Sequence, residues 1–77
     1  MNAREMFKKL GYTNRIFDDF IVYEKGDYIS LNVIEFHLKS KIIQSYTEEC
    51  ELGNVISGLT VEELKAINKQ CEELNWL

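Results

Sequence analysis

The chain has 77 residues, of which 45% are hydrophobic and 29% are charged, and its formal net charge is −4. This length and composition predict one ordinary folded domain, with little room for both a core and a deep active-site cavity. The acidic balance and the presence of only two arginines argue against the basic stripe with which proteins commonly bind DNA phosphates.

Short apolar runs and few cysteines predict a soluble protein of the cytoplasm. The run at residues 20–23 is far shorter than the roughly 20 residues of a membrane span, and the first residues lack the apolar stretch of a signal peptide. Cys50 and Cys71 are too few for the disulfide framework of a small secreted domain, so we expect two reduced thiols. Cys71 is expected in the core, whereas the glutamates around Cys50 disfavour a reactive thiolate.

A capped helix is predicted at the start of the chain. Asn2 is followed three residues later by Glu5, which is the spacing of a capping box. An apolar stripe then runs to Leu10, and Gly11 favours the left-handed conformation that ends a helix. We therefore predict a helix over residues 3–10.

Three strands are predicted in the middle of the chain. Residues 15–25 are rich in β-branched and aromatic side chains; Asp18 and Asp19 should bend or break the strand, so residues 20–24 are its firmer part. A turn is expected at residues 25–27, followed by one long strand or two short strands at 28–38. A reversal at 39–41 then leads to a returning strand at 42–46.

The apolar pattern changes parity within residues 28–38. Leu31 and Val33 share one face of a strand, whereas Ile34 and Phe36 share the opposite face. Because one inserted residue turns every later side chain to the other face, a continuous strand is expected to contain a bulge at Val33 and Ile34. The uncovered face of the sheet would then carry Ser30, Asn32, Glu35, His37 and some exposed tyrosine.

The last third of the chain predicts a loop followed by a helix. Residues 47–58 are polar and acidic and are expected to form a loop, with at most a brief extended piece at Val55 and Ile56. Thr60 and Glu63 then have the spacing of a second capping box, so we predict a helix over residues 61–74. Its expected core-facing stripe is Val61, Leu64, Ile67, Cys71 and Leu74, with Asn75 in the left-handed conformation and Trp76 and Leu77 folding back on the core.

The order helix, three strands, helix predicts an α+β fold. Short connections favour an antiparallel sheet, and the apolar stripes of the helices favour packing of both terminal helices on one face of it (α-β-β-β-α). A small three-stranded sheet has two edges with unpaired backbone groups, so both a monomer and a homodimer are compatible with the sequence.

The sequence contains no recognisable catalytic or metal-binding arrangement. His37 is the only histidine and lies on a different predicted element from either cysteine, whereas a zinc site needs several convergent ligands. Residues 53–60 have the glycine and threonine spacing of a phosphate-binding loop, but Leu59 occupies the position of its lysine. We therefore predict a protein that is not an enzyme and that needs no metal and no cofactor.

Glutamates are the candidate partner-binding residues. They cluster in the acidic loop and on the exposed side of the last predicted helix, where negative charge can meet a basic surface of another protein. The candidates are Glu48, Glu49, Glu51, Glu62, Glu72 and Glu73.

Two stretches carry a family resemblance: NAREMFKKLGY at residues 2–12 and TVEELKAINKQCEELNW at residues 60–76. They resemble the opening and the closing helix of small hypothetical proteins from phages and prophages of low-GC Gram-positive bacteria. The middle of the chain is similar only in its alternating strands, and Asn75 occupies a position where the group tends to have glycine. The resemblance implies a phage or prophage origin but no activity and no functional residue.

These observations predict a non-enzymatic phage or prophage accessory protein that binds a protein of the host or the phage. Its most specific form is an anti-defence inhibitor of a host protein, comparable to an anti-CRISPR protein. The alternative is a nucleic-acid-associated module that stacks single-stranded bases on exposed tyrosines of the sheet, although the acidic charge disfavours it. The residues for this alternative would be Tyr23, Tyr28, Tyr46, Lys25, Lys39 and Lys41.

Overall fold

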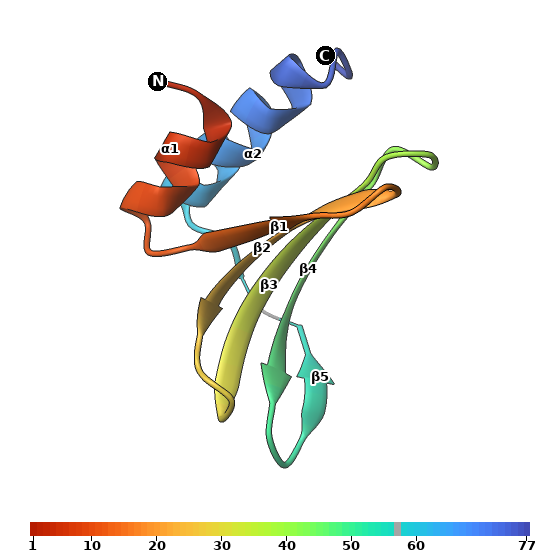
Figure 1. The fold of residues 1–77 in the computed structure, drawn as a ribbon. Coiled ribbons are helices and arrows are strands. Elements are labelled where there is room, and N and C mark those ends of the chain that lie inside the picture. The colour runs from red at the N-terminus through yellow and green to blue at the C-terminus, as the bar shows by residue number, and fades with distance from the viewer. Residues whose placement is uncertain (57) are drawn as a thin grey trace.

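The computed structural model describes residues 1–56 and 58–77. Its elements are α1 (Ala3–Lys9), β1 (Thr13–Ile16), β2 (Phe20–Gly26), β3 (Ser30–His37), β4 (Ile42–Glu49), β5 (Gly53–Val55) and α2 (Val61–Glu73). The strands form one antiparallel sheet in the order β1-β2-β3-β4-β5, and the two helices lie together on one side of it (Figure 1). The predicted α+β fold with both terminal helices on one face is confirmed. Within the described residues, neither helix is long and apolar enough to cross a membrane.

Both predicted capping boxes are present. In α1 the Asn2 side chain accepts a hydrogen bond from the Glu5 backbone N–H at 2.8 Å, and Glu5 accepts one from the Asn2 backbone in return at 3.1 Å. In α2 the Thr60 hydroxyl accepts from the Glu63 N–H at 3.0 Å, and Glu63 accepts from the Thr60 N–H at 2.8 Å. The last turn of α2 is followed by Asn75 at φ +60°, as the sequence predicted.

Loss of the cap on α2 is expected to destabilise the protein. Thr60→Ala removes the acceptor for the Glu63 N–H and should lower the free energy of unfolding by about 0.5–2 kcal/mol. Urea denaturation measures this change. Thr13→Ala is a matched control, because the exposed Thr13 hydroxyl makes only a long hydrogen bond of 3.4 Å to the Glu24 carbonyl. Equal stability of the two variants would contradict the capping role of Thr60.

The sheet has five strands rather than the predicted three. β1 forms a hairpin with β2 through the turn at Asp18 and Asp19, where a bend or break of the strand was predicted. The predicted loop at residues 47–58 is wrong at both strands, because β4 continues to Glu49 and β5 folds back against it, although the brief extended piece predicted there is confirmed at Val55. Gly53, at φ +72°, starts β5 in a conformation that few other residues adopt. Ser57, also within that predicted loop, lies outside the described residues.

The predicted bulge at Val33 and Ile34 is wrong. Val33 and Ile34 each have one partner on β2 and one on β4, and the register is uninterrupted on both sides. The parity change arises because β3 is the central strand: Ile34 is buried under the helices, and Val33 is buried on the uncovered face between its partners Glu24 and Tyr46. Ser30 and Asn32, predicted on the uncovered face, therefore have the same parity as Ile34 and lie on the helix side.

Two turns of the sheet need unusual backbone conformations. Gly26 has φ +124°, and a Cβ atom there would lie 2.2 Å from the Ser30 carbonyl oxygen, so no other residue fits without movement of the backbone. The predicted reversal at residues 39–41 is confirmed, and Lys41 takes φ +58° in place of a glycine or asparagine.

Aromatic side chains form the centre of the core. Phe7 of α1 is fully buried; its ring stacks on Tyr23 of β2 at 3.8 Å between centroids and meets Tyr12 and Phe36 edge-on. Trp76 folds back as predicted and its ring lies 6.3 Å from that of Phe36, whereas Leu77 stays exposed. Cys71 is buried in this core, as predicted, and burial raises the pKa of its thiol.

The face of α2 that packs on the core differs from the predicted stripe. Val61 and Leu64, predicted in the core, are 66% and 48% exposed. Ile67 and Cys71 of that stripe are buried and Leu74 packs against the core, as predicted, but the helix also buries Glu63, Ala66 and Gln70. Two tyrosines explain this orientation: the hydroxyl of Tyr12, just before β1, donates to the Glu63 carboxylate, and the hydroxyl of Tyr23 in β2 donates to Gln70 Oε1 at 2.6 Å. Buried polar side chains are tolerated when such partners satisfy them.

Candidate functional site

Two turns of the sheet meet at the end that lies away from the helices (Figure 1). The turn between β2 and β3 contains residues 27–29, and the end of β4 with the following turn contains residues 48–52. The two are joined directly, because the Cys50 N–H donates a hydrogen bond to the Ile29 carbonyl at 2.9 Å. We call residues 27–29 and 48–52 the tip.

The tip exposes large apolar side chains. Tyr28 is 87% exposed, Leu52 is 76% exposed, and Ile29 is also largely exposed. The first turn is held by Asp27, whose Oδ1 accepts hydrogen bonds from the Ile29 and Ser30 N–H groups at 2.9 and 3.1 Å. Tyr28 is therefore displayed on an ordered turn, and a group of exposed apolar residues of this kind is typical of a binding surface.

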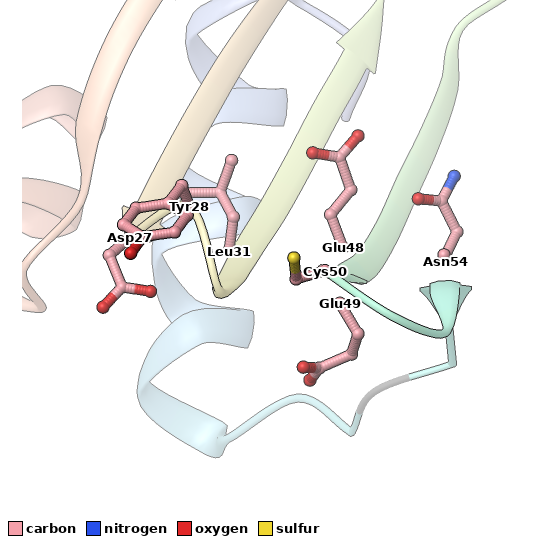
Figure 2. A pocket seen from close by; sticks show the side chains of 8 residues that line it. Asp27, Tyr28, Leu31, Glu48, Glu49, Cys50 and Asn54 are labelled. Carbon is pink, nitrogen blue, oxygen red and sulfur yellow. The ribbon is translucent and has the colours of Figure 1, made fainter.

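Carboxylates surround these apolar side chains. A hollow of about 240 Å³ at the tip is lined by Asp27, Tyr28, Leu31, Glu48, Glu49, Cys50, Gly53 and Asn54 (Figure 2). Figure 2 shows Glu48 and Glu49 pointing to opposite sides of β4, as strand alternation requires. A neighbouring hollow shares Glu49 and Cys50 and extends to Glu51 and Leu52. The apolar residues of the tip thus lie within an acidic rim.

The six predicted glutamates fall into two groups. Glu48, Glu49 and Glu51 come together at the tip, and Glu49 also accepts a hydrogen bond from the Ser30 hydroxyl at 3.0 Å. Glu62, Glu72 and Glu73 lie on α2, which runs away from the tip (Figure 1).

The glutamates of α2 have partners within the chain. Glu62 and Glu72 form long ion pairs with Lys65 and Lys69, at 3.5 and 3.7 Å. The Glu73 carboxylate accepts a hydrogen bond from the Ala3 backbone N–H at 2.7 Å, so it joins the end of α2 to the start of α1. The group at the tip is combined with a hollow and with exposed apolar side chains from two turns.

The tyrosines proposed for base stacking are not displayed together. Tyr23 is 2% exposed and belongs to the core, which corrects its prediction as an exposed residue of the sheet. Tyr46 is half-buried and donates to Glu35 at 2.8 Å; burial and this carboxylate raise its pKa, and Glu48 and Glu24 add to the effect. Only Tyr28 of the three is freely exposed, and it lies in the acidic tip, where a nucleic-acid phosphate would be repelled.

Ile29 and Leu52 of the tip were not predicted as binding residues, whereas Tyr28 was predicted as an exposed tyrosine, but for base stacking. Tyr28 and Ile29 directly follow a predicted turn, and Leu52 is an isolated apolar residue between an acidic run and Gly53. Apolar residues next to residues typical of turns are the feature that could have identified this exposed surface.

Other groups with possible chemistry include the tip carboxylates, the two thiols and His37, whose Nε2 lies 3.1 Å from Glu35 Oε1. Among the residues that the structure describes, no group of three or more His, Cys, Asp or Glu side chains is placed to hold a metal ion. Cys50 is exposed at the tip and Cys71 is buried in the core, so the two thiols are free. Comparison of this chain with protein-family models, with curated proteins and with solved structures finds no match in any of the three.

Proposed function

We propose that this protein acts by binding another protein through the tip, without catalysis. The observation that supports the proposal is the exposure of Tyr28, Ile29 and Leu52 inside an acidic rim. Specific protein interfaces combine a desolvated apolar centre with a polar rim, and tyrosine is enriched among the residues that contribute most to affinity.

The chemistry of the tip also describes the partner. The partner needs an apolar depression that accepts Tyr28 or Leu52, bordered by lysine or arginine side chains that face the carboxylates of the tip. The net charge of −4 adds a general attraction toward such a basic surface. The resemblance to phage and prophage proteins suggests a partner from the bacterial host or the phage, and inhibition of a host defence protein is the most specific form of the proposal.

Substitutions at the tip are expected to abolish partner binding. The double variant Tyr28→Ser, Leu52→Asp removes both anchors, so a protein captured by the immobilised wild-type chain from a Gram-positive host lysate should be lost. Ile16→Ser is the matched control, because Ile16 is an exposed apolar residue that pairs with Ile21 at the end of the sheet opposite to the tip. Raising the salt concentration from about 0.1 to 1 M shortens the screening length from about 10 to 3 Å and should also weaken capture.

The start of α2 is the rival surface. Val61 and Leu64 are exposed there beside Glu62. If Val61→Ser with Leu64→Ser removes the captured protein while the tip variant retains it, the tip is not the binding surface. Circular dichroism of each variant confirms that the fold is intact.

A further inference from the structure

One edge of the sheet is only partly covered. β5 pairs with β4 at Thr47, Glu48 and Glu49 only. Among the described residues, no strand lies on the outer side of β4 at residues 42–46, which we call the free edge. A hollow of about 430 Å³ lies beside it, lined by Glu35, Gln44, Ser45, Tyr46 and Asn54. Exposed strand edges of this kind pair readily with another strand.

The register shows which backbone groups of the free edge are available. The hydrogen bond from the Cys50 N–H to the Ile29 carbonyl makes these two residues a bonded pair. Because bonded and non-bonded pairs alternate along antiparallel strands, Tyr46 and the other even-numbered residues of β4 direct their N–H and C=O groups toward β3. Ile43 and Ser45 therefore direct theirs outward.

We propose that the free edge pairs with the same edge of a second copy of this chain, antiparallel, about a two-fold axis at Gln44. In this register Ile43 of each copy faces Ser45 of the other, so the outward backbone groups of both residues form hydrogen bonds. Ile42 of each copy faces Tyr46 of the other, and such aliphatic–aromatic pairs across strands are favourable. The pairing stops after five residues, because β5 covers β4 from Thr47 onward and the turn before Ile42 leaves the strand.

Opposite charges at the two ends of β4 favour pairing of the free edge with a second copy of the chain. Lys39 and Lys41 lie just before β4, and Glu48 and Glu49 lie at its far end. Antiparallel pairing places the basic end of one copy beside the acidic end of the other, twice in each dimer.

Sedimentation equilibrium with charge-reversed variants tests the pairing. A five-residue edge is small, so we expect a dissociation constant on the order of 100 µM, and the wild-type mass should rise above 9.1 kDa between about 10 µM and 1 mM. Lys41→Glu and Glu48→Lys should each weaken dimerisation by about threefold or more, because each replaces attraction with repulsion at both ends. An equimolar mixture of the two variants should recover association, since the mixed dimer has opposite charges at both ends.

Backbone methylation identifies the edge independently of the charges. A chemically synthesised chain with an N-methyl group on Ser45 loses an outward N–H and should remain monomeric with an unchanged circular dichroism spectrum. N-methylation of Ile16 is the matched control, because the hydrogen bond from the Phe17 N–H to Phe20 leaves the Ile16 N–H directed away from β2. The proposal is overturned if the wild type stays at 9.1 kDa up to 1 mM. It is also overturned if methylation at Ile16 rather than Ser45 removes the dimer, or if the mixed variants fail to associate.

Discussion

Phe7→Ala is expected to leave the chain largely unfolded at room temperature. Phe7 is fully buried and its ring contacts three aromatic rings. These rings belong to Tyr12, just before β1, to Tyr23 in β2 and to Phe36 in β3. Truncation of such a residue costs about 3–5 kcal/mol, whereas a single core in a chain of this size supplies about 3–5 kcal/mol in total. The expected result is loss of the cooperative thermal transition, measured by circular dichroism.

Leu64→Ala is the matched control for this result. The sequence periodicity predicted Leu64 in the core, but the structure leaves it half-exposed. Its truncation should therefore cost less than about 1 kcal/mol and preserve a cooperative transition. If Leu64→Ala were as damaging as Phe7→Ala, α2 would pack through the predicted stripe, and the orientation described for this helix would be wrong.

Glu63→Ala is expected to have the second-largest effect. The Glu63 carboxylate accepts hydrogen bonds from the Tyr12 hydroxyl and the Thr60 backbone N–H, and it is buried. Its removal leaves both donors without their partner, which should lower the free energy of unfolding by about 2–3 kcal/mol in urea denaturation at pH 7. Glu62→Ala, one residue earlier and exposed, should stay within about 0.5 kcal/mol of the wild type. Similar losses in the two variants would contradict the role of Glu63.

The contribution of Glu63 should also depend on pH. Burial alone would raise the pKa of Glu63, but hydrogen bonds from the Thr60 backbone, the Tyr12 hydroxyl and the Thr60 hydroxyl outweigh it and hold this pKa below its usual 4.5. The unfolded chain then binds the proton more readily than the folded chain. The stabilisation by Glu63 is therefore fully present above about pH 4.5 and is lost as the pH falls through the lower, folded pKa. The difference in the free energy of unfolding between the wild type and Glu63→Gln should shrink as the pH falls from 7 to 3. A difference that stays constant over this range would contradict a lowered pKa of Glu63 in the folded chain.

Local signals predicted the helices, whereas long-range contacts decided how they pack. Both capping boxes depend on residues three positions apart, so the starts of α1 and α2 could be predicted from the sequence. The face of α2 is set by Tyr12 and Tyr23, which lie 51 and 47 residues from Glu63 and Gln70. A periodic pattern within α2 contains no information about these partners.

The same distinction applies to the sheet and the tip. The parity change in β3 was interpreted as a bulge because an apolar residue on the uncovered face was not expected, although a central strand can bury both faces. The glutamates of the tip were predicted from charge alone. Leu52 was not predicted, and Tyr28 was predicted only as a base-stacking tyrosine. Their common surface depends on two turns, more than 20 residues apart in the chain, that meet at one end of the sheet.

Site-specific photocrosslinking tests the proposed binding surface most directly. A benzophenone side chain in place of Leu52 lies within the tip, and the same group in place of Val61 lies at the start of α2, where the native side chain is exposed to a similar degree. In host lysate, we expect a single protein to be crosslinked from position 52 and not from position 61, with less product at high salt. A product from position 61 alone, or equal products from both positions, would contradict binding through the tip.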